Sequence, residues 1–516
     1  MLIRRLKFCL ALWLLAEAAF ACAGPAELEA QDIAVHPVAP ASKQESQTQH
    51  ELDTGHGRLP YLATAAYLQV RLESGPTQCS IFYVSYVAQN SPGAQRPLTF
   101  VFNGGPGASS AYLHLGVLGP RRVVLTGADT RTPAALVDNP QSWLAFTDLV
   151  FVDPVGTGYS RCAESKPAED QQGRARRRDA ADASAWDVRE DLALLGRFIR
   201  LYLTRSQRWD ASKYLVGESY GGFRAAALTN TLQFDFGIEL TGAVLISPAL
   251  DFGFIRGGSN GLLPWVVKLP SYAATARVHG KSAGDTQPTR ASVQDVERFA
   301  LARVLPALAT GEIAAVSPEI AADIGLPEAR IAQLNGKVPL AVFTRELLRD
   351  KGRVLSSFDG SFAAIDPDPL SSSDSGEEPF LAAVNLRMTA AFNHYARKEL
   401  AFDTDLPYEL LNGRVTKQWN WRSGLDGDQG YVEVASDLKT GMSRNPRLKV
   451  LVAHGLYDLV TPYLGSVVVI RQLALDPKVA GNLTLQVYPG GHMFYSNDEA
   501  RQRFFEDART FFGSGR

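Results

Sequence analysis

Long hydrophobic runs are scarce in this sequence. After residue 23, no stretch reaches the ~18 consecutive apolar residues that a membrane-spanning helix needs. An excess of charge is also missing, because 52 basic residues balance 54 acidic ones and leave a net charge of -2. Near-neutral charge gives no reason to expect nucleic acid or an acidic membrane as a partner. We therefore expect the mature chain to be soluble, without a stable membrane span.

Signatures of bound metals and nucleotides are missing as well. No His, Cys, Asp or Glu residues have the spacing of metal ligands. Gly156 and Gly158 lack the further glycine and the following helix of a dinucleotide site. We therefore expect no metal and no cofactor. Internal repeats are absent too, and nothing in the sequence sets the oligomeric state.

Cysteine is rare, with four residues at positions 9, 22, 79 and 162. Removal of a leader would leave Cys79 and Cys162 in the mature protein, together with Cys22 if cleavage falls before that residue. An exported protein can form a disulfide between Cys79 and Cys162. Two buried free thiols are the alternative, and the sequence leaves both open.

A signal peptide is predicted over residues 1–23. A signal peptide typically has a basic start, a short apolar run and an A-x-A cleavage pattern. Here the basic start is Arg4, Arg5 and Lys7, the apolar run is Phe8–Leu15, and the cleavage pattern is Ala19-Phe20-Ala21. We expect export to the periplasm or the extracellular space. Arg4-Arg5 also fits twin-arginine export, and Cys22 would allow a lipid anchor, although Ala19 replaces the usual leucine. Residues 24–58 are polar and are predicted to be flexible.

Strand-like and helix-like stretches alternate over residues 59–250 and again over 446–516. This alternation predicts an α/β fold, with a mostly parallel central sheet covered by helices on both faces. Between them, residues 251–445 read as helices joined by polar loops, which predicts a largely helical cap insertion. Within these regions we also expect a β-hairpin at Tyr67–Val87 and a solvated basic loop at Gly173–Arg178. A mobile loop is expected at Ser371–Glu378.

The chain is organised around Tyr214–Gly222, which reads Y-L-V-G-E-S-Y-G-G. An apolar run leads into G-x-S-x-G, and the Ala-rich stretch after it is typical of a helix. This pattern predicts a nucleophile elbow, in which a strand turns sharply into a helix with Ser219 at its tip. The alternative is a glycine-rich turn with an exposed serine.

A nucleophilic serine needs a base, and the base needs an orienting carboxylate. In α/β-hydrolases these residues follow in the order Ser, Asp, His. Asp458 and His492 each follow a predicted strand and complete that order. Asp251 is the rival acid and His454 the rival base.

An oxyanion formed during acyl transfer needs two backbone N–H donors. One is expected from Tyr220, the residue after the nucleophile. The other is expected from the glycine turn Asn103–Gly107 after an earlier strand, and we choose Gly105. A Gly-Pro loop without a catalytic role is the alternative.

Five motifs together resemble the serine carboxypeptidase family, the carboxypeptidase Y-like branch of the α/β-hydrolases. They are N-G-G-P-G at 103–107, V-G-T-G-Y-S at 155–160, G-E-S-Y-G-G at 217–222, H-G-x-x-D at 454–458 and G-H-M at 491–493. The resemblance implies a bacterial-type serine carboxypeptidase that acts on peptides with Ser219, Asp458 and His492. It also implies that Asn103 and Glu218 bind the terminal carboxylate of the substrate.

The chain departs from that family at three positions. Phe102 replaces a usual tryptophan, and Ala108 replaces a cysteine, so one family disulfide is missing. Val117 stands where the family has a second carboxylate-binding glutamate, and valine cannot hydrogen-bond a carboxylate. An esterase or acyltransferase with the same triad is therefore the alternative function. A non-catalytic binding or scaffold protein is the third.

Overall fold

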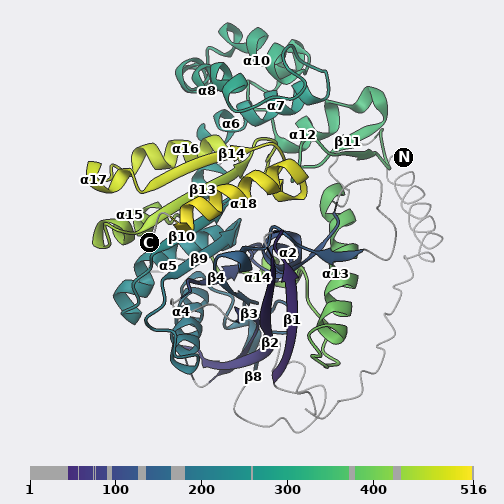
Figure 1. Cartoon of the computed structure of the whole chain (residues 1–516). Coiled ribbons are helices and arrows are strands. Elements are labelled where there is room, and N and C mark those ends of the chain that lie inside the picture. Colours follow the sequence, from purple (N-terminus) through teal and green to yellow (C-terminus); the bar gives the residue numbers. More distant parts are fainter. Residues whose placement is uncertain are drawn as a thin grey trace, which may run out of the picture. The chain divides into compact units, whose positions relative to one another are not determined.

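The computed structural model describes residues 45–513 (Figure 1), with gaps at 56, 74, 76, 90–95, 126–134, 164–180, 257–259, 371–377 and 422–431. These residues belong to one compact unit, Ser42–Arg516. The predicted signal peptide and the basic stretch Gly173–Arg178 lie outside the described residues, as does all of Ser371–Glu378 except Glu378. No helix in the described part of the chain is long and apolar enough to cross a membrane.

A 10-stranded sheet forms the centre of the molecule, in the order β1-β2-β3-β7-β4-β9-β10-β13-β14, with β8 paired to β3. Strands β7, β4, β9, β10, β13 and β14 run parallel to one another. Strands β1, β2 and β3 pair antiparallel in sequence, and β3 pairs antiparallel with β7. The predicted α/β fold with a mostly parallel sheet is confirmed, and its strand order is that of an α/β-hydrolase. The strands are β1 (Glu45–Asp53), β2 (Arg58–Arg71), β3 (Gln78–Ala88), β4 (Leu98–Phe102), β7 (Asp148–Val152), β8 (Arg161–Ala163), β9 (Lys213–Glu218), β10 (Gly242–Ile246), β13 (Lys449–Gly455) and β14 (Leu483–Tyr488).

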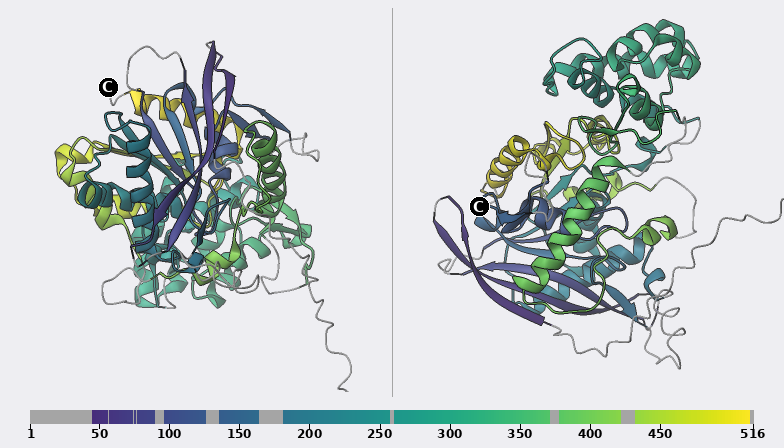
Figure 2. Two further views of the ribbon diagram at one scale, coloured as in Figure 1. Left: turned by 90° about the horizontal axis from the view of Figure 1, so that it is seen from below. Right: turned by 90° about the vertical axis from the view of Figure 1, so that its right-hand side faces the viewer.

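The central strands are buried on both faces, because helices cover each side of the sheet (Figure 2). All five residues of β4 are buried, and successive side chains point to opposite faces. Phe100 packs in one hydrophobic cluster with α4 (Val188–Arg205) and α5 (Tyr220–Phe236). Val101 packs in the other cluster, with α18 (Asp498–Gly513). The continuous apolar runs read from the sequence are therefore the strands of this two-sided core.

The prediction that residues 24–58 are flexible is wrong for the second half of that segment, because Glu45–Asp53 forms the edge strand β1. This strand pairs with β2 from Glu45↔Ala66 to Asp53↔Arg58. Its sequence is almost entirely polar because most of its side chains are exposed, and only Ser46 and Leu52 are buried. The Ser46 hydroxyl donates a hydrogen bond to the Leu400 carbonyl at 2.6 Å, which ties this edge to the insertion.

The predicted hairpin is present as β2 and β3, which pair antiparallel with Tyr67 opposite Phe82. Strand β8 continues the pairing on the other edge of β3 and places Cys79 opposite Cys162. The two cysteines are joined by a disulfide, with Cα atoms 3.9 Å apart. The register of two strands far apart in the sequence therefore decides between the two alternatives, in favour of the disulfide.

The stretch predicted as an insertion has two parts. The first is a lobe of short helices, made of α6 (Leu263–Val266), α7 (Leu269–Val278), α8 (Gln294–Phe299), α9 (Leu305–Thr310), α10 (Ser317–Ile324), α11 (Glu328–Gln333) and α12 (Leu340–Glu346) (Figure 1). The second part contains the hairpin β11 (Arg353–Leu355) and β12 (Ala363–Ile365), then α13 (Pro379–Lys398), α14 (Gly413–Gln418) and α15 (Ala435–Arg444). Helix α13 contacts α2 (Ala111–Leu113) and β5 (Arg121–Val123), and α15 packs on α5. The insertion thus contacts the core in several places.

Candidate active site

Ser219 lies at the turn between β9 and α5, where a nucleophile elbow was predicted. Its φ of 60° and ψ of -121° are strained for a residue with a side chain. A Cβ on Gly217 would lie 1.9 Å from the Gly221 carbonyl oxygen, and a Cβ on Gly221 would lie 2.4 Å from that of Phe102. Glycine is therefore required on both sides of the serine, because strand and helix backbones approach too closely for a side chain.

The Asn103–Gly107 loop lies directly against this elbow. A Cβ on Gly104 would be 2.5 Å from the Tyr220 backbone nitrogen, so the two turns touch. Gly105 has a φ of 99°. Within the described chain, neither the Gly105 amide nor the Tyr220 amide donates a hydrogen bond to another backbone group. Two free N–H groups beside Ser219 are what an oxyanion hole needs.

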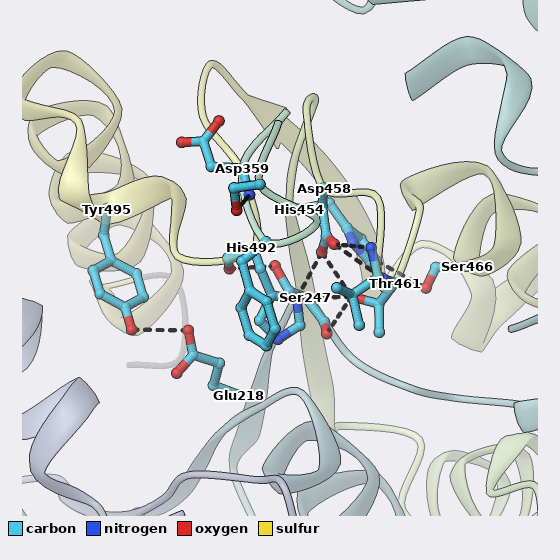
Figure 3. A network of polar contacts seen from close by, with 12 residues as sticks. Glu218, Ser247, Asp359, His454, Asp458, Thr461, Ser466, His492 and Tyr495 are labelled. Carbon is cyan, nitrogen blue, oxygen red and sulfur yellow. Dashed lines mark hydrogen bonds and ion pairs between the residues drawn. The ribbon is translucent and has the colours of Figure 1, made fainter. Parts of the chain in front are cut away.

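Asp458 and His492 form a buried pair after β13 and β14 (Figure 3). His492 Nδ1 lies 2.8 Å from Asp458 Oδ2. Asp458 Oδ1 accepts hydrogen bonds from the backbone amides of Val460 and Thr461, each at 2.9 Å. The Thr461 hydroxyl lies 2.6 Å from Asp458 Oδ2 and 3.0 Å from His492 Nδ1. These contacts fix the carboxylate and leave the other ring nitrogen of His492 available as a base.

The pKa of His492 is set by opposing influences. Burial lowers this pKa, but the charge and hydrogen bond of Asp458 raise it, as do the carboxylates of Glu218 and Glu378. The pKa of His492 is raised overall. Its imidazolium is therefore stabilised, as expected of a base that must hold a proton during the reaction.

Ser219 and His492 are connected through neighbouring strand ends. The Ser219 amide donates to the Ile246 carbonyl at 2.9 Å, and the Ser247 hydroxyl donates to the His492 carbonyl at 2.8 Å. In the part of the chain that the structure describes, no hydrogen bond joins the Ser219 hydroxyl to the His492 ring. Such bonds are often long in the absence of substrate and shorten in the complex.

The two rival residues have other partners. His454 Nε2 lies 2.8 Å from the Ser466 hydroxyl, and burial lowers the pKa of His454 to about 4. Asp251 accepts a hydrogen bond from the Gly253 amide at 2.7 Å and caps the short helix Phe252–Phe254. The geometry therefore favours Asp458 over Asp251 as the acid and His492 over His454 as the base.

Glu218 is buried directly before Ser219 and accepts hydrogen bonds on both oxygens. Asn103 Nδ2 donates to Oε2, and the Tyr495 hydroxyl donates to Oε1 at 2.8 Å. Asn103 is held in turn, because its Oδ1 accepts the Leu113 amide at 3.0 Å. Burial raises the pKa of Glu218 to about 7, against the opposing effects of His492 and the two donors. Sequence reasoning missed Tyr495, although it follows His492 by three residues.

Val117 lies in the π-helical turn His114–Leu118 and is 2% exposed. Its side chain belongs to a hydrophobic cluster, and its carbonyl accepts a hydrogen bond from Asn139 Nδ2 at 2.7 Å. This turn therefore supplies an apolar side chain where the resemblance would place an acid.

A loop of the insertion, Ser356–Ser361, packs against both halves of the acid–base pair. The His492 amide donates to the Phe358 carbonyl at 2.5 Å, and the Leu459 amide donates to the Ser357 carbonyl at 3.2 Å. Glu378 holds this loop, since its carboxylate accepts from the Ser356 hydroxyl and from the Ser357 amide at 3.0 Å. We refer to Ser356–Ser361 as the clamp loop. Nothing in the sequence pattern identified it.

Known proteins match the part of the chain that contains Ser219 and the Asn103–Gly107 loop. Residues 57–252 match the family model described as serine carboxypeptidase. Serine carboxypeptidase-like 36 from Arabidopsis thaliana is 32% identical over 192 residues, which cover 35% of this chain and 35% of the relative. Serine carboxypeptidase S10 family member 1 from Dictyostelium discoideum is 30% identical over 165 residues, covering 32% of this chain and 33% of the relative. The chain thus matches only a third of the length of these curated relatives.

Among solved structures, a soluble variant of monoglyceride lipase from Saccharomyces cerevisiae aligns with 87% of this chain and 94% of its own, at 11% identity and a TM-score of 0.35. That TM-score is too low to support an argument. The α/β-hydrolase fold is therefore assigned from the strand order of the central sheet. The family match contains the elbow and the Asn103–Gly107 loop, whereas Asp458 and His492 lie beyond it and depend on the geometry. Over residues 57–252, this chain is therefore similar to the serine carboxypeptidase family.

Proposed function

We propose that this protein is a serine carboxypeptidase that releases C-terminal residues from peptides through an acyl-enzyme on Ser219. His492 takes the proton of the Ser219 hydroxyl as the oxygen attacks the scissile carbonyl, and Asp458 stabilises the imidazolium that forms. The Gly105 and Tyr220 amides stabilise the oxyanion. His492 then gives the proton to the leaving amine, and water releases the acyl group by the same steps in reverse order.

The observation that carries this proposal is the Asn103–Glu218 hydrogen bond, one residue before the nucleophile. An amide donor and a buried carboxyl group beside the reacting serine can hold the terminal carboxylate of a peptide. Two ionised carboxylates cannot share a buried site, so binding requires that Glu218 carry a proton. A carboxyl group whose pKa lies at about 7 can take up that proton at moderate pH.

An esterase or acyltransferase with the same triad is the second candidate, and the buried apolar side chain of Val117 favours it. Fewer polar groups around a substrate carboxylate should weaken its recognition relative to substrates with a blocked carboxyl end. Comparing a peptide with a free C-terminus against the same peptide amidated separates the two functions. Preferential release of the terminal residue from the free peptide, followed by mass spectrometry, supports a carboxypeptidase; equal rates favour the second candidate.

A non-catalytic binding or scaffold protein is the third candidate. The paired Asp458 and His492 and the strained Ser219 argue against it, since a scaffold has no need of them. Labelling of Ser219 by a fluorophosphonate would exclude a scaffold, whereas an unlabelled, folded protein would favour one.

Export forms part of the proposal: a bacterial-type family member whose signal peptide is cleaved, with a periplasmic or extracellular location. The disulfide between Cys79 and Cys162 supports an oxidising compartment. Mass spectrometry of the mature N-terminus tests cleavage near Ala21. A product that retains residues 1–21 in the soluble cell fraction would contradict export.

A further inference from the structure

Tyr495 packs on the turn that carries Val117 and donates a hydrogen bond to Glu218. We propose that Tyr495 is a specificity-determining residue, whose hydroxyl donates a hydrogen bond to the terminal carboxylate of the substrate. This inference rests on the proposed function and adds a residue that the family resemblance does not supply.

The position of Tyr495 couples it to the base. It lies in the short helix η9 (Phe494–Ser496), three residues after His492 in the same loop. Its side chain is fully buried, and its hydroxyl donates to Glu218 Oε1 at 2.8 Å (Figure 3). One loop therefore presents the base to the reacting atoms and a hydroxyl to the carboxyl group beside Ser219.

The tyrosine ring is held against the turn that carries Val117. A Cβ placed on Gly116 would lie 3.0 Å from Tyr495 Cε2, so the ring edge fills the space over that glycine. The backbone carbonyl of Tyr495 accepts a bond from buried Arg501 at 3.4 Å. Ring and backbone are thus both fixed, and the hydroxyl cannot move far from Glu218.

A change in hydrogen-bond direction would let the Tyr495 hydroxyl donate to the substrate. In the free enzyme Glu218 is an acceptor for both Asn103 and Tyr495. When a substrate carboxylate binds, Glu218 takes one proton from solvent and becomes a donor. The protonated carboxyl group can then donate to the Tyr495 oxygen, while the hydrogen of Tyr495 turns to the substrate carboxylate. One proton is taken up for each carboxylate bound, and no covalent bond changes.

Tyrosine differs from an acid in this position because its hydroxyl stays a donor across the working pH range. Burial and the neighbouring Glu218 hold the pKa of Tyr495 well above its usual value. Only Glu218 then has to take up a proton. A site built from one acid and one phenol recognises carboxylates at higher pH than a site built from two acids.

The test uses full-length enzyme and the competitors N-acetyl-Phe-Leu and N-acetyl-Phe-Leu-amide. Each competitor inhibits hydrolysis of an N-acetylated phenylalanine methyl ester, and the ratio of the two Ki values measures carboxylate recognition. In the parent enzyme the acid should bind more tightly than the amide. Tyr495→Phe should reduce this preference by roughly 10- to 100-fold, the effect of one hydrogen bond to a charged group. The kcat for the methyl ester is measured alongside against pH, because the lost hydroxyl bonds Glu218, which also acts on His492.

Tyr488→Phe is the matched control, since its hydroxyl donates to the Asp507 carboxylate at 2.6 Å, away from Glu218. This variant should keep the parent preference. A parent enzyme that binds acid and amide equally would overturn the inference, and so would a Tyr495→Phe enzyme with the parent preference. A loss of ester kcat without a change in the Ki ratio would also overturn it, by showing a purely structural role. Release of leucine is measured separately by mass spectrometry, so a failure of the carboxypeptidase proposal is recognised independently.

Discussion

The backbone amide of His492 donates a hydrogen bond to the carbonyl of Phe358 at 2.5 Å. Their rings also meet edge to face, with centroids 5.0 Å apart. The base of the proposed triad is therefore held by a residue of the insertion, in addition to its own strand.

This contact leads to a prediction at Gly491. A Cβ there would lie 2.2 Å from the Phe358 carbonyl oxygen and 2.4 Å from the Asp359 Cα, so Gly491→Ala forces the clamp loop and the His492 loop apart. We expect the free energy of unfolding to fall by about 1–3 kcal/mol, as for other overpacked sites, together with a loss of kcat. Gly481→Ala is the control, because a Cβ at Gly481 meets nothing within 4 Å. Equal stability and activity in the two variants would contradict the clamp.

Ser219→Ala should lower kcat by ~10⁴-fold or more, because it removes the hydroxyl that forms the proposed acyl-enzyme. Initial rates with peptide and ester substrates measure the effect. Circular dichroism and the melting temperature should match the parent, since the substitution removes one half-buried hydroxyl. An active variant would refute the nucleophile.

Asp458→Asn should lower kcat by ~10⁴-fold, because the amide favours the wrong tautomer of His492. Asp251→Asn should leave kcat close to the parent value, because the Asp251 side chain caps the short helix Phe252–Phe254. Both are measured with the methyl ester at the pH optimum. If the Asp251 variant were the inactive one, the acid would be misassigned.

Glu218→Gln should change the pH dependence of peptide hydrolysis. In the parent, kcat/KM for a peptide should fall as pH rises through about 7, because Glu218 loses the proton that carboxylate binding requires. The rate with a blocked ester should instead rise with pH as His492 loses its proton. Glutamine is a donor at every pH, so the peptide profile of the variant should move towards the ester profile.

The same substitution removes a negative charge that raises the pKa of His492. The rise of the ester rate should therefore move to lower pH in Glu218→Gln. Measuring kcat/KM against pH for both substrates and both enzymes checks these shifts. Superimposable peptide profiles would show that Glu218 does not recognise the carboxylate.

Replacing Cys79 and Cys162 together by serine should reduce the free energy of unfolding by about 2–4 kcal/mol, because the bond closes a loop of 83 residues. Denaturant unfolding of both proteins, with and without reductant, measures the loss. Reductant should destabilise the parent and leave the double variant unchanged. A parent insensitive to reductant after full thiol release would contradict a stabilising bond.

The sequence predicts those features that local chemistry determines. Strand β4 is apolar throughout because both of its faces are covered, and Gly217 and Gly221 flank Ser219 because the elbow backbones touch. The edge strand β1 could not be recognised, since an exposed edge needs no apolar pattern. The disulfide depends on the register between β3 and β8, which no local pattern reveals.

The site residues that the sequence could not identify are those whose roles depend on long-range contacts. Choosing between Asp458 and Asp251 required the hydrogen bonds of His492. Tyr495 could be identified only when its hydroxyl was seen against Glu218, because a tyrosine after a histidine is common in a core. The clamp loop has no motif, since its role lies in backbone carbonyls that any sequence could present.

The clamp loop also bears on when the protein becomes chemically active. During synthesis, the elbow and the oxyanion loop emerge well before the clamp loop, and Asp458 and His492 follow later still. A nascent chain that has folded only its first sheet strands therefore contains the proposed nucleophile without its proposed base. On the proposed mechanism, Ser219 stays inert until β13 and β14 pair and the clamp loop packs on them, so assembly of the fold itself would delay hydrolysis.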